Sequence, residues 1–151
     1  MIITFCGHSQ FQATERVERA LLSLLEQKIG DASAALYLGG YGAFDAFALA
    51  CGQIYKAKHP STRLVLITPY ITESYQKTHL EVGRSRYDEI IYPPLEKVPY
   101  KFAISYRNRW MVDRAELVIA YVDRSWGGAY QAFQYAKQKD KAYINLAKTE
   151  E

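Results

Sequence analysis

The sequence is poor in the residues that cross-link small domains or hold metal ions. It has only two cysteines among its 151 residues, too few for a disulfide framework. No Cys/His pair has the spacing of a metal site, and we expect no metal and no cofactor. Cys6 and Cys51 both lie in apolar surroundings, which is typical of small buried thiols.

Long apolar runs and strong charge are also lacking. No stretch approaches the ~20 apolar residues of a transmembrane helix, and the first five residues lack the basic region and cleavage site of a signal peptide. We therefore expect a cytoplasmic protein that does not enter a membrane. The net charge is only +3, which allows a local anion site. Without a clustered basic stripe, this charge makes DNA an unlikely partner.

The composition is otherwise that of an ordinary globular protein. Apolar residues make up 49% and charged residues 23% of the chain, a balance that fits a single domain over residues 1–151. Tyrosine is unusually common, with 13 residues. Tyrosine rings can stack on flat ligands, but we expect most of them to be half-buried core or interface residues.

Strand and helix patterns alternate along the chain. Short apolar runs predict strands at residues 2–6, 34–38, 63–67, 88–92, 117–122 and 142–146. Helical spacing predicts helices at about 17–29, 43–56 and 103–114 and after residue 128, while residues 73–84 have a mixed pattern. This order predicts an α/β protein with a Rossmann-like, doubly wound, mostly parallel sheet and helices on both faces. Ligands of such sheets bind beyond the carboxyl ends of the strands, where the strand order reverses.

Three glycine-bearing turns fall at this edge, each before a helix. They are Gly7-His8-Ser9, Gly39-Gly40-Tyr41-Gly42 and Gly127-Gly128. Glycine lets the backbone approach a ligand closely, and the helix start behind it offers N–H groups to an anion. One such turn could be a plain strand-to-helix turn. Three at one edge predict a phosphate or ribose site, although none is a Walker loop or a full dinucleotide fingerprint.

Four side chains beside these turns are candidates for ligand contacts. His8 could donate to a phosphate or transfer a proton, or it could simply bond to backbone. Ser9 could contact an anion, although capping of the helix is the plainer role. Asp45 could hold a ribose hydroxyl or a base edge, or it could be placed there by the helix dipole alone. Trp126 could stack on a base or cover the core.

Residues 106–113 form the densest polar and aromatic cluster. Arg107 and Arg109 are two positions apart on a predicted helix, so they point in different directions and at most one easily faces the site. An arginine fork suits phosphate or carboxylate. The alternative is a surface ion pair with Asp113 or Glu116.

Together these motifs resemble the SLOG superfamily, which joins the DNA-processing DprA/Smf proteins with the Lonely Guy phosphoribohydrolases, and within it the small bacterial YpsA-type branch. The matching stretches are residues 5–8, 38–45, 107–113 and 117–122, followed by Trp126-Gly127-Gly128. The resemblance implies a Rossmann-like domain that binds a nucleotide or nucleotide-derived ligand. It also implies that the glycine loops and an arginine of residues 107–109 line the pocket, and that the chain can form a homodimer.

One stretch departs from the phosphoribohydrolases, which carry a Gly-Gly-x-Gly-Thr loop followed by a glutamate. Here Tyr130-Gln131 replaces the second Gly-Thr pair, and Gln134 stands where the resemblance leads us to expect the glutamate. A glutamine cannot act as a carboxylate base. We therefore expect a nucleotide-binding sensor or regulatory module, and no catalytic residue is assigned.

Two alternatives remain open from the sequence. The first is a hydrolase of a nucleotide N-glycosidic bond, with His8 assisting a carboxylate. The carboxylates that could serve are Asp45, Asp113, Glu116 and Asp123. The second alternative is a protein that binds a partner or DNA, by analogy with the DNA-processing relatives.

Overall fold

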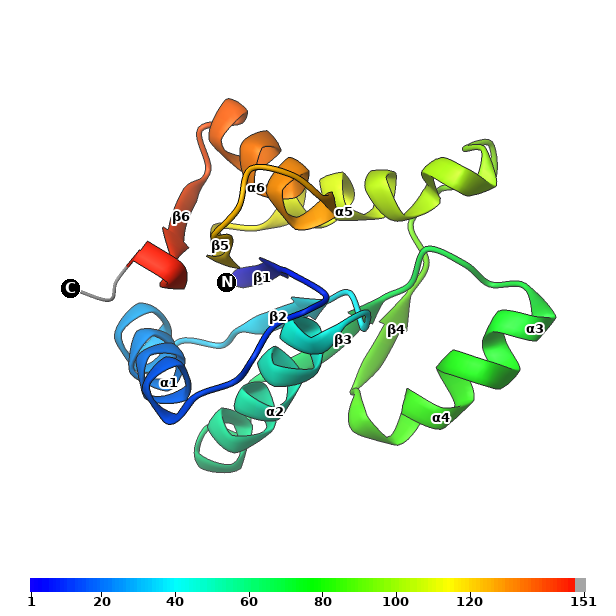
Figure 1. Cartoon of the computed structure of the whole chain (residues 1–151). Helices are drawn as coiled ribbons and strands as arrows, with labels where there is room; N and C mark the ends of the chain where they lie inside the picture. Colours follow the sequence, from blue (N-terminus) through cyan, green and yellow to red (C-terminus); the bar gives the residue numbers. More distant parts are fainter. Residues whose placement is uncertain (149–151) are drawn as a thin grey trace.

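A computed structural model describes residues 1–148, which are built on one six-stranded sheet (Figure 1). Its strands are β1 (Ile2–Gly7), β2 (Ala35–Leu38), β3 (Arg63–Ile67), β4 (Glu89–Ile91), β5 (Leu117–Tyr121) and β6 (Ala142–Asn145). Every neighbouring pair is parallel, in the order β4-β3-β2-β1-β5-β6. The predicted Rossmann-like α/β class is confirmed, and the sheet is parallel throughout.

Four long helices cover the two faces of this sheet (Figure 1). They are α1 (Glu15–Ile29), α2 (Ala43–Lys58), α5 (Ala103–Arg114) and α6 (Gly128–Gln138). The first two pack on one face and the last two on the other. Thr14 begins α1 by accepting the Val17 N–H with its side-chain oxygen at 3.2 Å, a typical N-cap bond.

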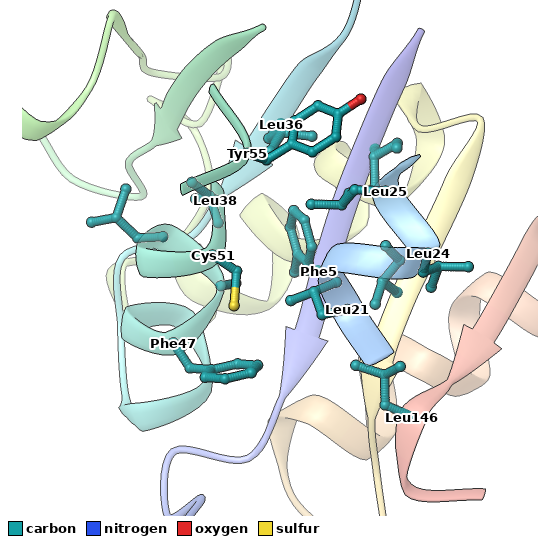
Figure 2. Close-up of a cluster of buried hydrophobic side chains, with 14 of the residues drawn as sticks. Phe5, Leu21, Leu24, Leu25, Leu36, Leu38, Phe47, Cys51, Tyr55 and Leu146 are labelled. Carbon is teal, nitrogen blue, oxygen red and sulfur yellow. The ribbon is translucent and has the colours of Figure 1, made fainter. Parts of the chain in front are cut away.

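Alternation along β1 divides the core into two layers, because successive side chains of a strand point to opposite faces. Phe5 joins leucines of α1 and β2 and Phe47 of α2 in the larger layer (Figure 2). Cys6 points to the other face, among residues of α5, β5 and α6. Both thiols are buried, as expected, and burial raises the pKa of Cys6 and of Cys51 to about 12.

The chain between β3 and α5 runs beside the outer edge of the sheet (Figure 1). It forms α3 (Glu73–Tyr75), a π-helical turn (Gln76–Leu80), α4 (Glu81–Gly83) and a 3₁₀ turn (Arg84–Arg86) before β4. The mixed pattern of residues 73–84 is therefore helical, with changing hydrogen-bond spacing. A further 3₁₀ turn (Tyr100–Phe102) leads into α5.

The connection from β4 through α5 carries the chain back across the sheet. Strands β1 to β4 are laid down in one direction, and β5 then pairs with the free side of β1. The strand order therefore reverses between β1 and β5. The turn after β1 and the turn after β5 meet at the carboxyl edge of these two strands, where open parallel sheets bind ligands.

Candidate functional site

A hollow of about 400 Å³ lies at this switch point. Its walls come from β1 and the turn after it, the start of α2, one side of α5, the loop after β5 and the start of α6. It brings together most of the residues singled out in the sequence. These are Gly7, His8, Ser9, Tyr41, Asp45, Arg107, Trp126, Gly127 and Gly128.

The glycines of the central turn are packed against protein rather than open to the hollow. Gly40 and Gly42 do not line it; they border a smaller depression on the other side of Asp45. Gly42 has a φ of +89°, and a Cβ there would lie 2.6 Å from Ser9 Cα. The first N–H of α2, that of Ala43, donates to the Ser9 carbonyl at 2.9 Å. Gly42 therefore lets two loops pack closely. The N-terminus of α2, which was predicted to bind an anion, instead donates to the Ser9 carbonyl.

The turn before α6 has the opposite character. Gly127 has a φ of +96°, and a Cβ added to Gly127 or Gly128 would find no atom within 4 Å outside its chain neighbours. Both glycines line the hollow and are exposed. The N-terminal N–H groups of a helix have no partner within the helix and suit an anion. Of the predicted turns, this one leaves room for a phosphate.

Arg107 is a buried clamp, with 3% of its surface exposed. Its Nη1 donates to the carbonyls of Gly39 at 2.9 Å and Ile67 at 2.7 Å, while its Nε donates to Asn108 Oδ1 at 2.9 Å. It thus joins the ends of β2 and β3 to α5. Gly39 does not line the hollow, but it permits this packing, because a Cβ there would lie 3.0 Å from Asp45 Oδ2 and 3.2 Å from Arg107 Cζ.

Arg109 points away from the hollow, as its spacing from Arg107 predicts. Its guanidinium carbon lies 5.5 Å from the ring centroids of both Tyr106 and Tyr135. The alternative ion-pair partners are engaged elsewhere. The Asp113 carboxylate accepts the Tyr135 hydroxyl at 2.7 Å, and Glu116 accepts a backbone N–H at the start of β1 at 3.1 Å.

Asp45 supplies the carboxylate of the hollow. It lies in the first turn of α2, and its Oδ2 accepts the Tyr41 N–H at 3.0 Å. Burial raises the pKa of Asp45 to about 6, against the opposing effects of the Tyr41 N–H and the Arg107 charge. A carboxylate held in this way can accept a hydrogen bond from a ligand hydroxyl or amino group. A strongly perturbed pKa in a cleft is also typical of functional sites.

His8 serves to join two loops. Only 6% of it is exposed, and its Nε2 accepts the Asp123 N–H at 3.2 Å. Burial lowers the pKa of His8, as does Arg124, while Asp123 opposes them. A neutral imidazole that accepts at Nε2 carries its proton on Nδ1. The sequence left open whether His8 contacts a ligand or bonds to backbone, and the structure has the bond to backbone.

Trp126 and Tyr41 form the rim of the hollow, with 67% and 64% of their surfaces exposed. Trp126 is therefore not a cover over the core. Sequence reasoning missed its neighbour Arg124, whose Nε lies 3.2 Å from Asp123 Oδ1 and whose Cζ is 5.1 Å from the Trp126 ring. Its place between β5 and the last glycine turn was the signal that could have identified it.

The carboxylates considered for a hydrolase are scattered. Asp45 lines the hollow, and Asp123 lies beside it, with its Oδ1 3.2 Å from Arg124 Nε. Asp113 and Glu116 have the partners given above, away from the hollow. Within residues 1–148, no three side chains of metal-binding type gather closely enough to hold an ion. No helix in that part of the chain is both long enough and apolar enough to cross a bilayer.

These features define a Rossmann-like protein with a ligand-sized hollow at the switch point, and the fold is shared with DprA. DNA processing protein A from Helicobacter pylori matches 95% of this chain over 63% of its own, with a TM-score of 0.63 and 15% identity. DprA from Streptococcus pneumoniae matches 93% of this chain over 48% of its own, with a TM-score of 0.59 and 10% identity. The chain thus spans less than two thirds of either protein, and the likeness is one of fold.

The sequence has a relative of similar length. YoqJ, an uncharacterized SPbeta prophage-derived protein of Bacillus subtilis strain 168, is 27% identical over 139 residues, covering 82% of this chain and 81% of that protein. No family model matches the sequence. The DprA-like part of the expected resemblance is therefore confirmed as a fold, while the YpsA-type branch and self-association stay predictions.

The expectation that DNA is an unlikely partner is wrong. It rests on the small net charge and the absence of a basic stripe in the sequence. The Helicobacter pylori protein, which shares this fold, binds single-stranded DNA. Single-stranded binding depends on local arginines and on stacked aromatic rings as well as on charge, so a net charge of +3 does not exclude it.

Proposed function

We propose that the hollow at the switch point binds a nucleotide, and that the chain is a nucleotide-binding module of the SLOG type, with a sensing or regulatory role. The observation that carries this proposal is the open Gly127-Gly128 turn, which begins α6 at the wall of the hollow. The phosphate would lie on the N–H groups of this turn, where the helix dipole favours negative charge.

The neighbouring side chains support a ligand with one charged end and one flat end. Arg124 lies beside the turn and supplies a cation. Trp126 and Tyr41 offer exposed rings on the rim, which suit the face of a base. Asp45 lies on the α2 side and suits a ribose hydroxyl or an amino group.

Titration calorimetry with nucleoside monophosphates, cyclic nucleotides and ADP-ribose tests the proposal. Gly128→Ala places a methyl group at the start of α6 without meeting protein atoms. We expect it to weaken binding ~10-fold, since it obstructs charge-assisted hydrogen bonds to the phosphate. Gly83→Ala is the matched control, because its Cβ would meet nothing closer than 3.6 Å and lies away from the hollow. Absence of millimolar binding by every probe, or equal binding by the two variants, refutes the assignment.

A second candidate function is binding of single-stranded DNA, favoured by the fold shared with the Helicobacter pylori protein. The exposed Trp126 and Tyr41 rings suit base stacking, which tolerates any sequence. Fluorescence anisotropy with a labelled oligothymidine, at two salt concentrations and against a duplex control, tests it. We expect Trp126→Ala to weaken binding by ~1–3 kcal/mol, the worth of one base stacked on an aromatic ring. Equal binding of duplex and single strand would argue against this function.

A further inference from the structure

A second hollow lies beside the first, between α5 and α6. Its volume is about 450 Å³, and we call it the α5–α6 groove. It shares four wall residues with the switch-point hollow, namely Ile104, Asn108, Gly128 and Ala132. The two hollows therefore adjoin at the start of α6, and Gly128 belongs to both.

The walls of the α5–α6 groove are polar and basic. Lys101 and Arg109 supply two cations, and Gln131 and Gln134 supply amides from α6. No carboxylate lines this groove in the part of the chain that the structure describes. Cations and amide donors without an opposing carboxylate suit a ligand rich in acceptor oxygens, such as a phosphate ester.

Arg109 contacts two tyrosine rings. Tyr106 comes from α5 and Tyr135 from α6, each with its ring centroid 5.5 Å from the guanidinium. Tyr135 is fixed in turn by its hydroxyl, which donates to Asp113 Oδ1 at 2.7 Å. An arginine stacked in this way loses less side-chain entropy when it binds an anion. Asp113, engaged with the tyrosine, is not among the residues that line the groove.

We propose that the α5–α6 groove holds a second phosphate-linked nucleoside, so that the preferred ligand is a dinucleotide unit rather than a mononucleotide. This inference rests on the nucleotide-binding function proposed above. The linking phosphate lies on the N–H groups at Gly128, the residue that both hollows share. One nucleoside then occupies each side of the α6 start, and the second phosphate of the unit faces Arg109 and the α6 amides.

The direct test compares AMP with pApA, and UMP with pUpU, by titration calorimetry on the full chain. We expect each dinucleotide to bind at least ~10-fold more tightly than its mononucleotide, since the groove adds charge-assisted hydrogen bonds. Equal affinities would overturn this inference while leaving the nucleotide-binding function intact. If no probe binds, both fall.

Two arginine variants test whether the higher affinity for the dinucleotide comes from the α5–α6 groove. Arg109→Gln should narrow the dinucleotide-to-mononucleotide affinity ratio by ~5–10-fold. Arg114→Gln is the matched control, because Arg114 lies on the same helix, 3.9 Å from the Trp110 ring, and lines neither hollow. If both variants change the ratio equally, the groove is not the second site. Lys101→Gln provides an independent variant should Arg109→Gln fail to fold.

Longer probes separate the two sources of a dinucleotide unit. An octamer of the same base that binds as tightly as the dinucleotide supports a nucleic acid strand that passes through both hollows. An octamer that is excluded while the dinucleotide binds supports a free dinucleotide. An octamer that binds with only the affinity of the mononucleotide contradicts the groove as a second site.

Discussion

Replacing Gly42 by alanine tests whether the central glycine turn serves packing between loops. Its φ of +89° and ψ of 174° lie in a region essentially restricted to glycine, and any other residue there costs ~1–3 kcal/mol. The new Cβ would also lie 2.6 Å from Ser9 Cα and 2.8 Å from Ser9 Cβ, so the two loops must separate. Separation strains or breaks the 2.9 Å bond from the Ala43 N–H to the Ser9 carbonyl, which is worth ~0.5–1.5 kcal/mol.

Together these effects should lower the free energy of unfolding by about 2–4 kcal/mol. Urea denaturation followed by far-ultraviolet circular dichroism measures the change, and the midpoint should fall by about 1–2 M. The comparison variant is Gly128→Ala, which also begins a helix but has open space around its Cβ. Its unfolding free energy should stay within ~0.5 kcal/mol of the wild-type value.

The pair of variants therefore separates two uses of glycine at one sheet edge. Gly42→Ala should lose stability, and Gly128→Ala should lose ligand affinity with its stability kept. If Gly42→Ala unfolds at the same urea concentration as the wild type, the close packing against Ser9 does not contribute to stability. If Gly128→Ala is the less stable of the two, the turn before α6 is structural and the phosphate assignment loses its support.

Two further predictions concern buried polar groups. Because burial raises the pKa of Asp45 from 3.8 to about 6, the stability that its protonated form contributes is complete below pH 3.8 and is lost as pH rises through 6. Asp45→Asn should remove this decline and be about 1–3 kcal/mol more stable than wild type at pH 7. Urea midpoints at pH 4 and pH 7 measure the change. Equal pH dependence of stability in the variant and the wild type would contradict the prediction. Asn145→Ala should lower the free energy of unfolding by about 2–4 kcal/mol. The buried Asn145 side chain accepts the Val122 N–H at 3.0 Å and donates to the Val122 carbonyl at 2.9 Å. A loss below 0.5 kcal/mol, about the size of an ordinary surface substitution, would show that water replaces these two hydrogen bonds.

The alternation of apolar runs and helical stripes was enough to predict the fold. Each predicted strand is found within a residue or two of its expected bounds, and α5 spans Ala103–Arg114 as its periodicity indicated. A parallel sheet buried on both faces gives continuous apolar runs, which are easy to identify. The helical stretch of residues 73–86 was harder to predict, because it lies outside the sheet and most of its side chains are exposed.

The sequence predicts where the site lies but not which of its groups are free to bind a ligand. Three glycine turns at one edge are visible in the sequence, but the partners of their N–H groups are not. The α2 start is occupied by the Ser9 carbonyl, and the Arg107 guanidinium by carbonyls 40 and 68 residues away. Such contacts depend on how loops meet in three dimensions, so sequence spacing did not separate the open turn at Gly127-Gly128 from the packed one at Gly42.

The charges of the switch-point hollow bear on which ligand it suits. Arg107 uses its Nη1 and Nε to bind two backbone carbonyls and Asn108. Arg124 and the N-terminus of α6 also line the hollow, and both favour an anion. Asp45 lies on the α2 side and would repel a ligand that is anionic throughout. An inorganic phosphate suits only the side of the hollow formed by Arg124 and the α6 start, and not the side formed by Asp45. A nucleotide has both an anionic end and hydroxyl or amino donors, so its polarity matches that of the hollow.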